Sequence, residues 1–280
     1  MRIPRIAKWE ILGTARMNLR LSLLAAAFLS SAVAPTSAAD LPRAAYASVP
    51  PIHSWSGFYV GVNAGYTVEN RDHLNFTGTD TGADGLGTTL GLGLLPGRVT
   101  LQPDGIFGGG QIGYNWQAGT IVYGVEADIQ GSSARDNFSV VSLPPSGPIT
   151  VAGSNSLEWL STVRGRFGIS ATPMTLLYVT GGLAIAETKL NISGLCVTCA
   201  PVLASAASSK EVSTGWTIGA GAEWALAGGW SVKSEYLYYD LGSAEAMLTY
   251  DYATWTSTLT AHVNNSGHIV RVGVNYKFHN

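Results

Sequence analysis

The chain has 280 residues, of which 46% are hydrophobic and only 12% are charged, and its mean hydropathy is +0.19. This composition is too apolar for a disordered chain, and it is undercharged for a soluble enzyme, where roughly a quarter of the residues are charged. Glycine is in excess: it accounts for 34 of the 280 residues, about 12%, against a usual frequency of about 7%. The formal charge of −2 argues against a nucleic-acid partner, because such proteins carry a basic surface.

The first 39 residues have the pattern of a secretory signal peptide. A short basic segment at 17–20 precedes an uncharged stretch at 21–34, and Ser37 and Ala39 are the small residues that a signal peptidase reads. A membrane anchor is the alternative, but a helical span needs about 20 predominantly apolar residues, and this run ends in Pro, Thr and Ser. We therefore predict a start at Met17, cleavage after Ala39 and export through the general secretory pathway.

Hydrophobic residues of the exported chain recur with period two, which is the period of a β-strand and not of a helix. In the segment 121–130, Ile, Tyr, Val, Ala and Ile occupy one face, and Val, Gly, Glu, Asp and Gln occupy the other. A helix would scatter the two acidic residues around its apolar stripe. The two-sided pattern recurs in eight segments, at 58–66, 109–116, 121–130, 158–169, 176–188, 216–224, 230–238 and 270–278.

The connections between these segments alternate between short and long. The short ones are 117–119, 171–174 and 225–229, and the long ones are about 68–104, 131–156, 189–211 and 241–264. Short turns at one end and long loops at the other are typical of bacterial outer-membrane barrels. We therefore predict an all-β fold, an eight-stranded antiparallel up-and-down transmembrane β-barrel with short periplasmic turns and long extracellular loops. It would span residues 55–280, after a periplasmic N-terminal linker at 40–54.

One face of each predicted strand should contact lipid, and the other should fill the lumen. The first face carries aliphatic residues with aromatic residues near its ends. Phe58 and Tyr66, for example, would lie roughly 26 Å apart at about 3.3 Å per residue, close to the height of the lipid-facing band. The second face carries Gly, Asn, Thr and the charged residues, and the lumen of an eight-stranded barrel is just wide enough for side chains to fill.

Four acidic and four basic residues on the second face are expected to meet and pair inside the barrel, because pairing allows charges to remain buried. This predicted lumen charge network consists of Glu126, Asp128, Arg164, Arg166, Glu223, Lys233, Glu235 and Arg271. We interpret it as a polar plug that holds the barrel shut. A small gated conduit and a catalytic role are the alternatives.

The opening segment from Trp55 to Tyr66 reads WSGFYVGVNAGY, and further glycine- and aromatic-rich stretches follow it. These stretches are 108–116, 122–128, 163–168, 178–184 and 270–278. Together, over about 55–278, they resemble the porin-like outer-membrane β-barrel surface antigens of alphaproteobacteria, the immunogenic outer-membrane protein family. The resemblance implies an eight-stranded barrel with surface-exposed loops. Some relatives bind haem or contribute to envelope integrity and host contact, but the family has no shared ligand site whose residues can be carried over.

The C-terminus fits the insertion signal of this family with one departure. Tyr276 and Phe278 correspond to the terminal aromatic residues that the barrel assembly machinery recognises, but His279 and Asn280 follow them here. The resemblance implies the barrel assembly machinery and periplasmic chaperones as partners during biogenesis, and outer-membrane lipid afterwards. Extracellular partners would bind through the loops.

Two local motifs have ordinary explanations. Residues 108–113 fit the G-x-G-x-x-G pattern, but a dinucleotide site needs a helix that starts within it, and here an alternating strand continues.

Cys196 and Cys199 are the two cysteines of the chain, in an exported loop, with no second pair to complete a zinc site. A local disulfide and two free thiols are the remaining interpretations.

Three histidines are the candidate ligands or bases. His73 and His262 fall in outer loops, where imidazoles can bind haem iron or a metal, although solvated loop histidines are far commoner. His268 is the nearest candidate for the base of a rim-located lipid hydrolase, but no grouping of His with Ser and Asp is visible in the sequence. We assign no catalytic, cofactor or metal residues.

The sequence therefore predicts a non-enzymatic barrel of the Gram-negative cell outer membrane, with a structural and surface-exposed role and a lumen closed by paired charges. A haem-binding or narrow-channel transport protein is the first alternative, and a rim-located lipid hydrolase is the second. The prediction includes no cofactor and no nucleic-acid partner.

Overall fold

A computed structural model describes residues 53–70, 72–82, 85–142, 148–196, 203–251 and 256–278. The predicted signal peptide at 1–39 and most of the predicted linker at 40–54 lie outside these residues, so both remain predictions. In the part of the chain that the structure describes, no helix has the length and apolar character needed to cross a membrane.

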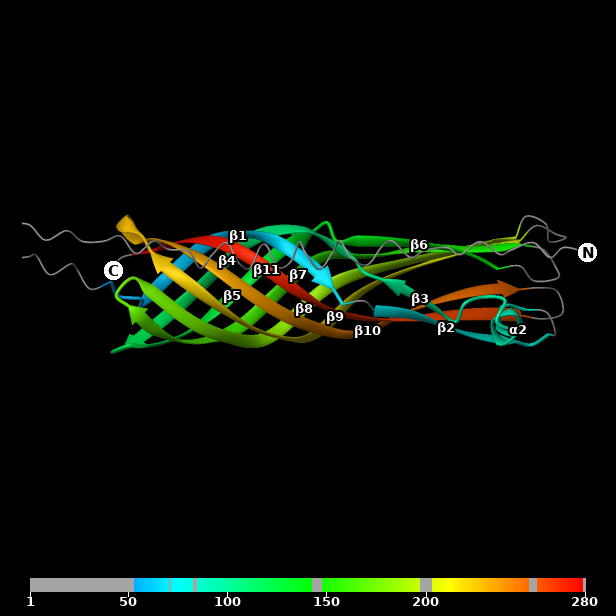
Figure 1. Ribbon diagram of the computed structural model, residues 1–280, viewed down its shortest axis with the longest axis horizontal. Coiled ribbons are helices and arrows are strands. Elements are labelled where there is room, and N and C mark those ends of the chain that lie inside the picture. Colours follow the sequence, from blue (N-terminus) through cyan, green and yellow to red (C-terminus); the bar gives the residue numbers. More distant parts are fainter. Residues whose placement is uncertain are drawn as a thin grey trace, which may run out of the picture. The chain divides into compact units, whose positions relative to one another are not determined.

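Eight strands form a closed antiparallel ring. In order around the ring they are β1 (Gly57–Glu69), β4 (Asp104–Ala118), β5 (Ile121–Ser132), β7 (Ile149–Thr172), β8 (Thr175–Cys196), β9 (Leu203–Ala225), β10 (Trp230–Asp251) and β11 (Thr256–Lys277). The ring closes because β11 pairs with β1, from Tyr59 opposite Lys277 to Glu69 opposite Gly267. The predicted eight-stranded antiparallel barrel is therefore confirmed (Figure 1).

Three shorter strands and two short helices complete the described secondary structure. They are β2 (Asp72–Asp80), α2 (Leu86–Gly91), β3 (Arg98–Leu101), β6 (Arg135–Ser142) and the 3-10 helix η1 (Ala227–Gly229). β2 pairs with β11, β3 pairs with β2, and β6 pairs with β7, all at the end of the barrel that has the long connections. We call this part the extension, made of the described residues within 72–101, 135–156, 189–211 and 243–264.

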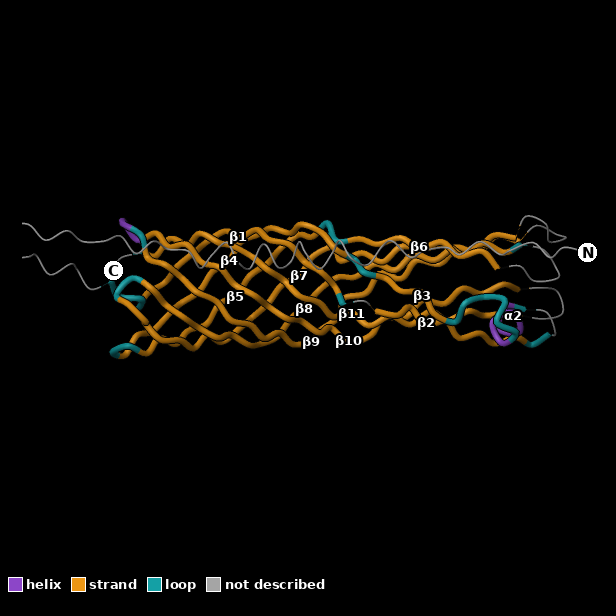
Figure 2. The backbone as a smooth tube through the Cα atoms, in the orientation of Figure 1, coloured by secondary structure: helices purple, strands orange, loops and turns teal. Residues whose placement is uncertain are grey.

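The segments predicted as long loops consist largely of strand. β7 to β11 are 22 to 24 residues long, roughly twice the length expected from the sequence, and they run from the barrel into the extension (Figure 2). The alternation of buried and exposed residues continues there, but small residues occupy many of the buried positions. In β10, for example, Ala244 and Ala246 are buried in the same row as Leu248. Alanine is weakly hydrophobic, so the pattern is difficult to recognise in the sequence.

A bulge in β10 divides the extension into two sheets. Pairing between β9 and β10 ends at Asp240 opposite Trp216, and the register of β10 then shifts at Gly242, which has a φ of +78°. Beyond this point, β9 pairs with β8 and β10 pairs with β11. The extension therefore contains a β6–β7–β8–β9 sheet and a β10–β11–β2–β3 sheet, with an apolar core that includes Leu74, Leu190 and Leu259.

The side chains of the barrel are sorted by face. In β1, Phe58, Val60 and Val62 are exposed on the outside, whereas Tyr59 and Asn63 are buried inside. The interior is layered along the barrel. An apolar cluster around Trp55 lies at the end with the short turns, and a second cluster around Leu160, Leu237 and Ile269 lies nearer the extension.

Candidate functional site

The charged residues predicted to face the lumen lie together between these two apolar clusters. β5 contributes Glu126 and Asp128, β7 contributes Arg164 and Arg166, and β9 contributes Glu223; β10 contributes Lys233 and Glu235, and β11 contributes Arg271. They occupy alternate positions of their strands, so all point inward, and none is more than 4% exposed. We call these eight residues the lumen charge network.

Glu126 is the centre of the lumen charge network. Its carboxylate lies 2.5 Å from Arg164 Nη2, and Lys233 Nζ donates to both of its oxygens at 2.9 Å. Arg166 and Arg271 each lie 3.5 Å from it, on opposite oxygens. One carboxylate thus contacts four cations from β7, β10 and β11, so it joins opposite walls of the barrel.

Two arginines connect the remaining acids of this layer. Arg164 Nη2 lies 2.7 Å from Asp128 Oδ2, and its Nη1 lies 3.1 Å from Glu235 Oε1. Arg271 is paired with Glu235 and lies 3.0 Å from Asp128. The ion pairs therefore cross the lumen in more than one direction. Pairing of this kind is needed because an isolated buried charge loses its hydration.

Arg166 connects the network to the end with the short turns. It donates to Glu223 Oε2 at 2.7 Å, and its guanidinium lies 3.9 Å from the ring centre of Tyr178 and 5.7 Å from that of Tyr59. Contact with aromatic faces favours a guanidinium over an ammonium group. Gly221 makes room for this arrangement, because a Cβ there would lie 2.6 Å from Tyr178 Cζ.

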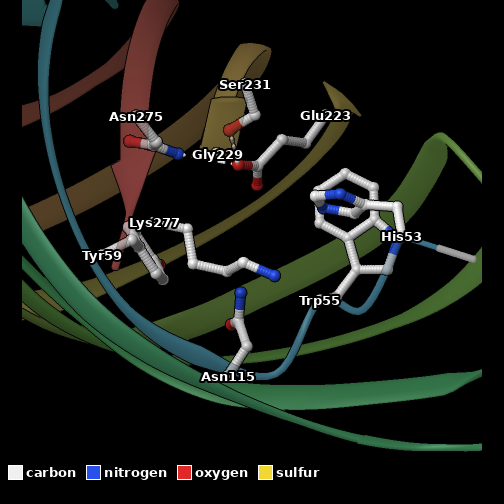
Figure 3. Close-up of a pocket in the computed structure, with 9 residues that line it drawn as sticks. All are labelled: His53, Trp55, Tyr59, Asn115, Glu223, Gly229, Ser231, Asn275 and Lys277. Atoms are coloured by element: carbon white, nitrogen blue, oxygen red, sulfur yellow. Dashed lines mark hydrogen bonds between the residues drawn. The ribbon is translucent and has the colours of Figure 1, made fainter. Parts of the chain in front are cut away.

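A small pocket lies next to Glu223 at this end of the lumen (Figure 3). Glu223 Oε1 accepts hydrogen bonds from Ser231 Oγ at 2.5 Å and from Asn275 Nδ2 at 2.8 Å. Trp55 also lines the pocket and is 3% exposed, and its backbone N–H donates to Gln117 Oε1 at 2.7 Å. The residues just before β1 thus cover part of the mouth of the barrel.

The remaining predicted residues lie away from this network. Tyr276 and Phe278 are at the end of β11 with their rings in contact, 5.2 Å apart, and Phe278 also contacts Phe58. Their role in insertion stays a prediction. Cys199 and the side chain of Cys196 lie outside the described residues, so their pairing also stays a prediction.

The three candidate histidines, all of which the structure describes, do not form a common site. His73 lies 3.3 Å from Thr100 Oγ1, and His262 pairs with Glu245 at 3.0 Å. His268 lies at the barrel rim, where its two ring nitrogens are taken by Tyr236 Oη at 2.6 Å and Asn70 Oδ1 at 2.9 Å. Among the described residues, no group of three or more His, Cys, Asp or Glu side chains is placed to hold a metal ion.

Neutral residues of the same inward face, which were not part of the predicted lumen charge network, surround the charges. Tyr59 Oη donates to Glu126 at 2.8 Å, Gln111 donates to Asn275 at 2.5 Å, and Asn63 donates to Gln111 at 3.0 Å. All four residues lie on the inward face of an alternating strand. That alternation is the signal that could have identified them.

Comparisons with known proteins agree with this architecture. Residues 23–278 match the family model described as the outer membrane protein beta-barrel domain. The chain is 36% identical to the 31 kDa outer-membrane immunogenic protein of Brucella melitensis, over 92% of this chain and 98% of that protein. It is 32% identical to the 22 kDa outer membrane protein of Rhizobium leguminosarum bv. viciae, over 73% and 76% of the two chains. It is 27% identical to the 25 kDa outer-membrane immunogenic protein of Brucella abortus, over 85% of each chain.

Proposed function

The chain belongs to the outer membrane protein β-barrel domain family, and we propose that it is a non-enzymatic structural barrel whose lumen is closed by its charge network. It lies in the cell outer membrane, as its relatives do. The three relatives above are named as outer-membrane or immunogenic proteins, and none of these names is that of an enzyme.

The contacts of Glu126 carry the proposal of a closed lumen. Side chains from β7, β10 and β11 reach this one carboxylate, and its side chain and those of Arg164, Lys233 and Arg271 have no exposed surface. A continuous water channel would need to pass between these groups and would expose them. The interior of an eight-stranded barrel is narrow enough for its own side chains to fill.

The extension supports the proposed surface-exposed role. The long connections of bacterial outer-membrane barrels face the outside of the cell. In this chain they form two paired sheets with an apolar core of their own, so they hold a defined surface above the membrane. We propose that extracellular partners bind through this surface, including the segments 68–104 and 241–264.

Single-channel recording of the refolded mature chain in a planar bilayer tests the closed lumen. Heat-modifiable gel migration first establishes that the barrel has formed. We expect negligible conductance from the wild-type protein and stepwise conductance from Glu126→Ala/Arg164→Ala, which removes two side chains from the centre of the lumen. Steady, large conductance from the wild-type protein would overturn the proposal.

Hemin titration tests the alternative that the protein is a haem-binding barrel. No shift of the Soret band is expected, because each histidine discussed above already has a polar partner within the chain. A saturable shift that is lost in His73→Ala/His262→Ala would make the protein a haem-binding barrel instead.

A further inference from the structure

A row of basic side chains crosses the outer wall of the β6–β7–β8–β9 sheet. Arg135 of β6 is paired with Ser156 of β7, Ser156 with Lys189 of β8, and Lys189 with Lys210 of β9. Residues directly opposite each other in neighbouring strands point to the same face of a sheet. The register therefore places these four side chains in one row.

The three cations of the row face outward, whereas Ser156 between Arg135 and Lys189 is buried. Thr188 and Leu190, on either side of Lys189, are buried in the interior, so Lys189 lies on the opposite face of β8. The side chains of Arg135 and Lys210 are 59% and 63% exposed. All three cations are therefore accessible from outside the barrel.

The charges within the row are not balanced. Lys189 and Lys210 are direct cross-strand neighbours, an arrangement in which like charges repel each other. Glu158 lies 4.0 Å from Arg135, and Glu187 lies 3.1 Å from Lys210. Within the described part of the chain, no carboxylate forms an ion pair with Lys189. Lys210 is paired and Lys189 is not, so the excess positive charge is that of Lys189 next to its like-charged neighbour, where an anion would relieve the repulsion.

The row lies next to the lipid-facing surface. The next row toward the barrel consists of Trp159, Glu187 and Val212. It is two residues away along β8 and β9 and three along β7, where the register shifts, and Val212 is exposed and apolar. At about 3.3 Å per residue, the basic row lies roughly 7 Å farther along the strands. With the edge of the hydrocarbon core at Val212, the row lies at the depth of the polar headgroups, which add about 5–8 Å to each side of that core.

A row of amide and hydroxyl groups follows on the side away from the membrane. Asn191 Nδ2 donates to Ser154 Oγ at 3.1 Å, and Ser208 Oγ donates to Asn191 Oδ1 at 2.9 Å. Asn137 of β6 is paired with Ser154 and completes this row. Such groups on a sheet surface can exchange hydrogen bonds with sugar hydroxyls.

We propose that this outer wall binds the headgroup of an anionic, phosphate-bearing glycolipid of the outer leaflet. Lys189 and Lys210 would contact a phosphate, and the row around Asn191 would contact the sugar beyond it. The order of the two rows matches a headgroup whose charge lies near the membrane. The inference rests on the proposed outward orientation of the extension but not on the closed lumen, because a conducting lumen would leave this wall unchanged.

Native mass spectrometry of the full mature chain in detergent tests the site, with bisphosphorylated lipid A as the probe. We expect Lys189→Gln/Lys210→Gln to weaken binding roughly 30-fold, because each basic side chain near an anionic surface contributes about 1 kcal/mol. Arg98→Gln is the matched control. Arg98 is an exposed cation on the other sheet of the extension, where it donates to Asn75, so its replacement should leave binding unchanged.

Further probes show which chemical groups of the lipid the site binds. Dephosphorylated lipid A, phosphatidylglycerol and inorganic phosphate should each bind more weakly than bisphosphorylated lipid A. Equal affinity of the wild-type protein and the double lysine variant would overturn the site, as would phosphatidylglycerol binding as tightly as the glycolipid. If the double variant does not give the heat-modifiable form, Lys189→Gln alone replaces it, with about a fivefold loss expected.

Discussion

Glu126 holds together side chains from across the barrel. Its carboxylate neutralises a site that four cations share, and Tyr59 adds a further hydrogen bond. Removing one partner of a buried ion pair is more damaging than removing both, because the remaining charge has neither water nor a counter-ion. At this position the unbalanced charge would be distributed over three arginines and a lysine.

We expect Glu126→Gln to lower the free energy of unfolding by about 3–5 kcal/mol, the usual cost of breaking a buried pair. Urea unfolding in lipid vesicles, followed by tryptophan fluorescence, measures this change. Glu245→Gln is the control, because Glu245 is 58% exposed and pairs with His262 at 3.0 Å, and exposed pairs contribute at most about 1 kcal/mol. Equal stability of the two variants would contradict a structural role for the network.

At the scale of the element, the bulge of β10 decides where the barrel wall divides. Gly242 has a φ of +78°, and nothing lies within 4 Å of a Cβ built there. A side chain at this position would therefore be unfavourable because of the left-handed backbone conformation, since there is space for it. Gly131 of β5 also has open space around a built Cβ, but it has no such φ.

The two glycines give a matched pair of variants. Gly242→Ala should lower the free energy of unfolding by about 1–2 kcal/mol, the cost of a left-handed conformation for an L-residue. Gly131→Ala should be neutral or slightly stabilising, because alanine loses less backbone entropy than glycine. Urea unfolding of both variants is the measurement, and an equal effect would show that the conformation of Gly242 is not required.

Helix α2 is attached to β2 and β11 through one carboxylate. Asp80 Oδ2 accepts from the backbone N–H of Thr88 at 2.6 Å, and Oδ1 accepts from Ser257 Oγ at 2.7 Å and from Gly87 N–H at 3.1 Å. Burial acts to raise the pKa of Asp80, but these hydrogen bonds to its charged form outweigh burial and hold the pKa below its usual value. The ionised carboxylate therefore stabilises this attachment.

A carboxylate with a lowered pKa stabilises the folded form above its unfolded pKa of about 3.9, and that contribution is lost as the pH falls through the folded pKa. Amide hydrogen exchange of the 85–91 segment, corrected for the intrinsic rate, should therefore accelerate below about pH 4. In Asp80→Asn the exchange should be faster at neutral pH and independent of pH over this range. Pronounced pH dependence in this variant would assign the effect to another group.

At the scale of the whole described structure, the interior of the barrel and the core of the extension have different chemistry. The barrel contains the lumen charge network between two apolar clusters, whereas the extension has an apolar core that includes Phe76, Leu248 and Leu259. The extension is therefore stabilised by burial of its own apolar side chains. The barrel is stabilised by its closed ring and by the lipid around it.

Leu259→Asp should unfold the extension and leave the barrel intact. Leu259 is buried in the apolar core, where an unpaired carboxylate is unfavourable. Extracellular protease added to whole cells should cleave the variant within the extension. Leu183→Asn, an exposed position on the outside of the barrel, should show no such cleavage. Loss of heat-modifiable migration from Leu259→Asp would show that the two parts fold as one unit.

The sequence determined the architecture of the barrel and the direction of its side chains. Eight alternating segments and three short turns predicted the ring, and alternation placed Glu126 and Arg164 inside and Val163 outside. These properties are local, because successive residues of a strand point to opposite faces wherever the strand lies.

The tertiary structure decided which charges pair, how far the strands extend and where the wall divides. Pairing of Glu126 with Lys233 and Arg271 depends on the register between strands that are distant in the chain. The extension becomes strand because apolar residues that are scattered among small and polar ones, such as Leu190, Leu248 and Leu259, acquire a common core only when two sheets face each other. The basic row of Lys189 and Lys210 exists only through the pairing of β8 with β9. Such long-range registers follow from closure of the ring and from bulges such as that at Gly242, which no local pattern of residues specifies.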